Sequence, residues 1–280
     1  MGLGTGPLLG NDEAMGEQQL VDARTGEPLA PATPAATLVV MRDDPQGGPA
    51  ELLMVQRSRE MVFAGGATVF PGGRVDPDDH AMGAQFAPHL EPDEAAARIA
   101  AIRETLEETG YCVGIDGSPD IALVKQVRQA LHAGDAFSAL CRDAGWRLDL
   151  DAMVAFARWR PPFNESRVFD TRFYVTRDLG ESQHVEVDAT ENTHVFWASA
   201  QRVIDMAAEG EAKIIYPTHR NLERIALYPS YDALIGHIRE FPSRMIMPRV
   251  QEREGRRYLC IPEDAGYPVT AEAIDTAMRG

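Results

Sequence analysis

The segment from Asp93 to Thr109 constrains the fold of this chain more than any other stretch. Apolar side chains recur there at three- and four-residue steps, which aligns them on one face of an α-helix. The residues that share this spacing are Ala95, Ile99, Ile102 and Leu106. Asp93 could cap the start of the helix, and Gly110 suits its end. We therefore predict a helix that buries one apolar face against a larger core.

A second face of the same helix carries three carboxylates. Glu104, Glu107 and Glu108 stand at positions i, i+3 and i+4 and therefore lie together. Repulsion at these spacings destabilises a bare helix by roughly 0.2–0.5 kcal/mol per pair, which a divalent cation would offset. A small set of hard oxygen ligands favours Mg²⁺ or Mn²⁺, which take further ligands from water and substrate phosphates. A second interpretation stays open, because charged helix faces are usually only solvated, and the chain would then be a plain scaffold.

Segments with strand and helix character follow one another irregularly along the chain. Strands are expected at 37–41, 51–56, 67–70, 153–159, 173–175, 194–197 and 257–261. Further helices are expected at 121–133, 136–144, 199–208, 217–227 and 231–239. Residues 76–91 are polar, contain proline and predict a loop. Because strands do not alternate regularly with helices, we predict an α+β fold with a mixed sheet.

Charge and composition limit the partners and the compartment. The net charge of −16 disfavours nucleic acid and anionic membranes, but not a small phosphorylated substrate neutralised by metal ions. No window of roughly eighteen apolar residues predicts a membrane span, and the first residues lack the basic stretch of a secretory signal. Cys112, Cys141 and Cys260 are odd in number and dispersed, which favours a reducing compartment. We therefore expect a cytoplasmic protein.

Two motifs at the ends of the region 69–110 together resemble the signature of the Nudix hydrolases. The first is a strand ending in Phe70-Pro71-Gly72-Gly73-Arg74, and the second is Arg103-Glu104-x-x-Glu107-Glu108-x-Gly110. The resemblance implies a Nudix-like α/β/α sandwich and hydrolysis of a diphosphate that depends on Mg²⁺ (or Mn²⁺). It also implies an insertion inside the motif at about 76–92, and the helices near 118–150 form an extra helical insertion. We expect a flexible N-terminal tail at 1–34, a Nudix hydrolase domain at 35–230 and a C-terminal extension at 231–280 packed on the same domain.

The resemblance assigns roles to individual residues by position. Gly72 would offer its backbone carbonyl to a metal ion, and Glu107 and Glu108 would be direct ligands. Glu104 would be a ligand or the base that orients the attacking water, and Arg103 would hold the carboxylates through charge-assisted hydrogen bonds. A further metal-binding glutamate is expected in a loop ahead of a strand that carries tryptophan. The candidates for it are Glu191 and, as the alternative, Glu186.

The motif departs from the family pattern at two positions. The glutamate that the family has near the start of the helix would fall at Ala95, so Glu94 or Asp93 would have to substitute for it. Thr105 stands where the family usually has an aliphatic residue.

Other segments resemble the branch that contains coenzyme A diphosphatase-like proteins. They are Phe169-Asp170-Thr171-Arg172-Phe173 and Tyr216-Pro217-Thr218, together with Arg57-Ser58-x-x-Met61, which matches in part a motif of coenzyme A pyrophosphatases. Arg57 and Arg74 are accordingly the candidate substrate-binding residues. Coenzyme A or an acyl-CoA is the leading substrate, and a nucleotide sugar, a dinucleotide or another nucleoside diphosphate derivative is the alternative. A Nudix-fold module that senses a nucleotide without cleaving it also stays open, and a homodimer is expected because Nudix-like proteins are often dimers.

Overall fold

A computed structural model describes residues 21–22, 24–44, 46–58, 64–116, 119–164, 168–178 and 192–277. Within the predicted N-terminal tail, the side chain of Asp22 is buried and accepts hydrogen bonds from the backbone amides of Arg24 and Asn164. These bonds hold the pKa of Asp22 at about 2, with the Asn164 amide as the largest cause. Among the described residues, no helix combines the length and the apolar character that are needed to cross a membrane.

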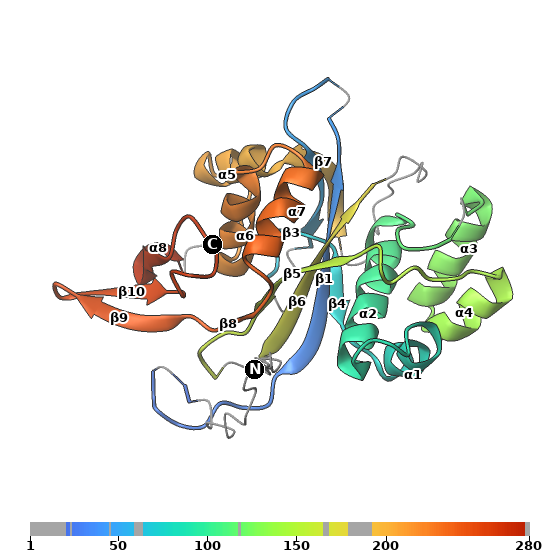
Figure 1. Ribbon diagram of the computed structural model, residues 1–280, viewed down its shortest axis with the longest axis horizontal. Coiled ribbons are helices and arrows are strands. Elements are labelled where there is room, and N and C mark those ends of the chain that lie inside the picture. Colours follow the sequence, from blue (N-terminus) through green and yellow to red (C-terminus); the bar gives the residue numbers. More distant parts are fainter. Residues whose placement is uncertain are drawn as a thin grey trace, which may run out of the picture.

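A mixed β-sheet forms the centre of the molecule (Figure 1). Its strands are β1 (Thr33–Arg42), β2 (Glu51–Arg57), β3 (Thr68–Val69), β4 (Gly72–Arg74), β5 (Val154–Trp159), β6 (Phe169–Arg177), β7 (Asn192–Ser199) and β8 (Met245–Ile246). The main path of the sheet runs β3-β2-β1-β6-β5-β8, while β4 pairs with β1 and β7 pairs with β2. The β1–β6 and β5–β8 pairs are parallel, and the β1–β2 and β5–β6 pairs are antiparallel. The predicted mixed sheet is therefore confirmed.

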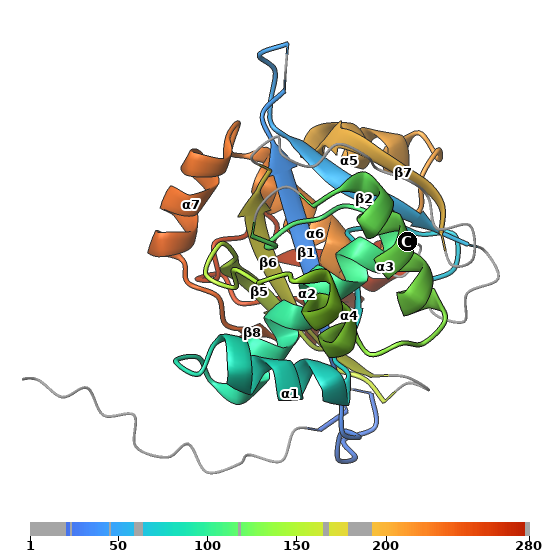
Figure 2. The ribbon, with the colours of Figure 1, turned by 90° about the vertical axis from the view of Figure 1, so that its right-hand side faces the viewer.

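Helices cover both faces of this sheet (Figure 1). One face carries α1 (Pro77–Phe86), α2 (Pro92–Thr109), α3 (Ile121–His132) and α4 (Phe137–Ala144), which Figure 2 shows in front of the strands. The opposite face carries α5 (Ala200–Ala208), α6 (Tyr216–Ala226) and α7 (Tyr231–Glu240). The chain ends in a small sheet of β9 (Arg249–Arg253), β10 (Arg256–Cys260) and β11 (Ala271–Ala273), followed by α8 (Ile274–Ala277).

The alternation of side chains along β1 creates the two hydrophobic cores. Leu38 and Val40 point to the α2 side and pack in one cluster with Ile99, Ile102 and Leu106 of α2. The intervening residues Val39 and Met41 point to the other side and pack in the cluster formed with α5, α6 and α7. Because consecutive side chains of a strand point to opposite faces, one almost continuously apolar strand serves both layers.

The structure corrects the prediction for the region between the two motifs. Residues 77–86 form the helix α1 instead of the predicted loop. The helix starts at Asp76, whose side chain forms a reciprocal capping box with Asp79, and Pro77 occupies the first turn, where its missing amide is harmless. The start of α2 was also predicted wrongly, because its N-cap is Glu91 and Asp93 lies inside the first turn. The short strands β4, β8, β9 and β11 were not predicted.

Candidate active site

The diglycine bend and the acidic helix meet in the structure. Strand β4 pairs with β1, with Gly72 opposite Thr37 and Gly73 opposite Ala36, which places the bend directly below α2. The backbone amide of Gly72 donates a hydrogen bond to Oε2 of Glu108 at 3.0 Å. A β-carbon on Gly73 would lie 2.5 Å from Oε2 of Glu104, so only glycine leaves room for that carboxylate.

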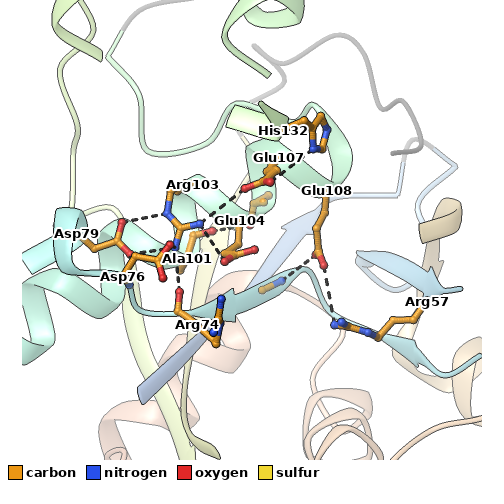
Figure 3. Close-up of polar contacts among 12 residues, drawn as sticks. Arg57, Arg74, Asp76, Asp79, Ala101, Arg103, Glu104, Glu107, Glu108 and His132 are labelled. Atoms are coloured by element: carbon orange, nitrogen blue, oxygen red, sulfur yellow. Dashed lines mark hydrogen bonds and ion pairs between the residues drawn. The ribbon is translucent and has the colours of Figure 1, made fainter. Parts of the chain in front are cut away.

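At this contact Glu108 is buried and Glu104 is partly buried. Figure 3 shows how their carboxylates lie. Burial raises the pKa of Glu104 to about 7; Arg103 opposes this shift, and the charge of Glu107 adds to it. Burial, followed by repulsion from Glu104, raises the pKa of Glu108 to about 8, although Arg57 and the Gly72 amide lower it. Two carboxylates that are both desolvated therefore lie side by side. Their mutual repulsion favours the binding of a cation between or beside them.

The third glutamate points elsewhere. The carboxylate of Glu107 lies 3.7 Å from Nη1 of Arg103 and 3.5 Å from Nδ1 of His132 (Figure 3). It is more exposed than Glu104 and Glu108. The Glu107 carboxylate therefore lies at the more exposed edge of the site.

Arg103 connects most groups of the site. Its guanidinium donates to both carboxylate oxygens of Asp79 at 3.1 and 2.9 Å, to Oε1 of Glu104 at 2.9 Å and to the Arg74 carbonyl at 2.9 Å. Burial alone would lower the pKa of Arg103, but the hydrogen bond to Asp79 and the charges of Glu104 and Asp79 raise it well above its usual range. A permanently charged, planar group with several fixed partners is suited to orienting carboxylates and poorly suited to transferring a proton.

The acidic partner of Arg103 was not predicted. Ala95 is buried against Gly83 of α1, Glu94 pairs with Arg98, and Asp93 is exposed, so neither Glu94 nor Asp93 reaches Arg103. The fully buried Asp79 takes that place instead. The family spacing, counted backward from Arg103, ends at Ala95 inside α2, whereas Asp79 lies in the insertion before α2. The sequence signal that was available is the Asp76-Pro77-x-Asp79 pattern of a capped helix start.

The other predicted residues lie around the same contact. Arg57, at the end of β2, places Nη1 4.0 Å from Oε1 of Glu108, whereas the side chain of Arg74 is exposed. Glu191, like its alternative Glu186, lies outside the described residues. Its neighbour Asn192 pairs with Arg57 across the β2–β7 ladder and is buried. Sequence reasoning passed over Asn192, although it directly follows the glutamate candidate.

The residues of the site fit a divalent metal ion. The raised pKa values of Glu104 and Glu108 show that the surrounding positive charge does not offset their desolvation, and the absence of a side chain at Gly73 lets the Glu104 carboxylate lie against the bend. The side chain of Asn192 is buried beside Glu108, and its hydrogen bond to that carboxylate lowers the pKa of Glu108. Within the described part of the chain, no three carboxylate, histidine or cysteine side chains converge closely enough to hold a metal by themselves. Further ligands would therefore be backbone carbonyls, water or substrate phosphate, as Mg²⁺ commonly uses.

A mixed sheet between helical layers, with a diglycine bend beneath a helix that carries Arg-Glu-x-x-Glu-Glu, defines a Nudix fold. The family profile described as the NUDT19 Nudix domain matches residues 84–225, just over half of the chain, and the protein belongs to this family. The expected family and fold are thereby confirmed.

Known proteins with similar sequences or structures agree with this assignment. The acyl-coenzyme A diphosphatase NUDT19 of Gallus gallus is 26% identical over 239 residues, covering 66% of this chain and 63% of the relative. The human protein of the same name is 25% identical over 282 residues and covers 81% of this chain and 75% of the relative. The putative nudix hydrolase 7 of Caenorhabditis elegans is 24% identical and covers 65% of this chain. The chain thus spans 63% and 57% of the length of the chicken and nematode relatives. A crystal structure of a Nudix hydrolase from Alicyclobacillus acidocaldarius superimposes with a TM-score of 0.65 at 27% identity, covering 74% of this chain and 96% of that one.

Proposed function

We propose that the protein is a divalent-metal-dependent diphosphatase that hydrolyses the diphosphate linkage of coenzyme A or an acyl-CoA. The observation that carries the proposal is the contact of Gly72 with the buried carboxylate of Glu108 and of Gly73 with the partly buried carboxylate of Glu104. The substrate class is supported by the names of the chicken and human relatives. Mg²⁺ or Mn²⁺ would be held by Glu104, Glu108 and the Gly72 carbonyl, with Glu107 and Glu191 as further candidate ligands.

The chemistry requires a water molecule to attack one phosphorus of the diphosphate. A bound metal ion would neutralise phosphate charge and lower the pKa of that water. Glu104 would either bind the metal ion directly or accept the proton of the attacking water. The P–O bond to the bridging oxygen then breaks, and two phosphate monoesters leave: from coenzyme A, a nucleotide and a phosphopantetheine. Arg103 keeps Glu104 in place, and Arg57 and Arg74 supply positive charge for the departing phosphates.

A substrate screen with product identification tests the proposal. Coenzyme A, an acyl-CoA, NADH, ADP-ribose and ADP-glucose would each be incubated with Mg²⁺ or Mn²⁺, and the products resolved by mass spectrometry. We expect the coenzyme A compounds to be cleaved at the diphosphate and Glu108→Gln to abolish turnover. Tight binding of a nucleotide without turnover of any compound would support the sensing module instead.

A further inference from the structure

The helices of the two insertions, α1 on one side and α3 with α4 on the other, contact α2 and each other. Asp79 of α1 holds Arg103 of α2 through two hydrogen bonds. Asp78 of the same helix accepts hydrogen bonds from the backbone amide and the hydroxyl of Ser138 in α4, at 2.8 and 2.6 Å. The second insertion is thereby tied to the first, and Figure 2 shows α3 and α4 stacked beside α1 and α2.

Helix α3 contacts the last turn of α2. Nε and Nη2 of Arg128 donate to the backbone carbonyls of Glu107 and Glu108, at 2.8 and 2.9 Å. The side chain of Arg128 is buried, and its Nη1 would lie 3.3 Å from a β-carbon on Gly110, the residue that ends α2. His132, one turn further along α3, lies 3.5 Å from the carboxylate of Glu107.

These contacts give the last backbone carbonyls of α2 the hydrogen-bond donors and the positive charge that the helix lacks by itself. The last carbonyls of a helix have no partner within it, and α2 has no basic residue in its own last turn. Helix ends fray, and Glu107 and Glu108 lie in the turn that would fray first. Fixing their carbonyls fixes the direction of their Cα–Cβ bonds and so limits where the carboxylates can go.

We infer that Arg128 is a positioning residue that holds the metal-binding turn of α2 in its binding geometry. The inference rests on the proposed function, because it assumes that Glu108 and its neighbours bind a divalent ion. It assigns a role to the helical insertion: α3 holds the last turn of α2 in the geometry that the metal ion requires. Groups that orient metal ligands from outside typically change metal affinity or activity by about 10- to 100-fold when they are removed.

Titration of the 280-residue protein with Mn²⁺, followed by electron paramagnetic resonance, measures metal affinity without turnover. We expect Arg128→Ala to weaken Mn²⁺ binding by about 10- to 100-fold and to lower kcat by a similar factor. Arg128→Lys, which keeps the charge but loses the paired donors, should fall between the two proteins. Guanidinium ion at a non-denaturing concentration should restore part of the affinity of Arg128→Ala, whereas the same ionic strength of sodium chloride should not. Arg142→Ala, an exposed arginine of the same insertion, is the matched control and should bind Mn²⁺ like the parent.

Amide hydrogen exchange provides a second readout, because loss of Arg128 should speed exchange at residues 107–110 before other parts of α2. Unchanged Mn²⁺ affinity in a folded Arg128→Ala protein overturns the inference and leaves the proposed function intact. If Arg128→Ala does not fold, unchanged affinity in Arg128→Lys leads to the same conclusion. A parent protein that binds no Mn²⁺ overturns the proposed function, and the inference with it.

Discussion

Replacing either glycine of the diglycine bend by alanine should damage the protein in two different ways. At Gly73 the new β-carbon would lie 2.5 Å from Oε2 of Glu104, which is the far end of a flexible side chain. At Gly72 it would lie 2.7 Å from the Cα atom of Thr37, which belongs to the central strand β1. Gly72 also has a φ of 157°, a value that other residues rarely adopt. Gly73→Ala should therefore reduce activity with little loss of stability, and Gly72→Ala should destabilise the fold.

The magnitudes follow from the distances. Ordinary contact begins at 3.4 Å, so the Glu104 carboxylate must move by about 1 Å to accept Gly73→Ala. A displacement of about 1 Å at a reacting group can reduce activity by about 100-fold. The free energy of unfolding of Gly73→Ala should fall by only about 1 kcal/mol, the lower end of the range for overpacking, because only the end of a side chain moves. For Gly72→Ala the backbone of β1 must move. We therefore expect the loss in the free energy of unfolding to reach the upper end of the range for overpacking, about 3 kcal/mol or more.

Steady-state kinetics with coenzyme A and thermal unfolding of both variants check this prediction. A loss of about 3 kcal/mol lowers Tm by about 6–12 °C in a protein of this size. Gly73→Ala should unfold close to the parent temperature and lose kcat, while Gly72→Ala should unfold early. Parental kcat in Gly73→Ala, or parental Tm in Gly72→Ala, would refute the argument from contact distances.

Three further outcomes concern the charges of the site. Asp79→Asn leaves the buried Arg103 without its main counter-charge; removing one partner of a buried pair costs about 3–5 kcal/mol, so Tm should fall by about 6–20 °C in a melting experiment. In the metal-free protein, Glu104 and Glu108 have pKa values of about 7 and about 8, above the ordinary glutamate value of 4.5. The folded state therefore binds more protons than the unfolded state across this window, and stability measured with a chelator should fall as pH rises from about 5 to 8. A rise would contradict the assigned burial. Glu108→Gln removes the buried charge and should raise the metal-free Tm at pH 8 while abolishing the stabilisation by added Mg²⁺; a variant that Mg²⁺ still stabilises like the parent would show that the ion binds elsewhere.

The local pattern of the sequence was sufficient for α2 and for the central strands. The apolar residues of α2 recur at helical spacing and therefore share one buried face. Strand β1 is apolar along most of its length because its side chains enter the cores on both faces of the sheet. The short strands β4 and β8 carry no such period, and pairing with β1 and β5 makes them strands. Helix α1 lacks a clear apolar stripe, and its capping box and the contact of Asp79 with Arg103 support it instead.

The sequence by itself indicated the mixed sheet through the irregular order of its strands and helices. The resemblance of its two motifs to the Nudix signature indicated the family and the proximity of the diglycine bend to the acidic helix. Only the tertiary structure decided which groups surround that contact. Asp79, Arg128 and Asn192 come from three segments distant from Glu108 along the chain, and no spacing rule links them to it. Their roles arise from burial: once the carboxylates leave water, every nearby donor and charge acts on them strongly, and the packing of the insertions selects those neighbours.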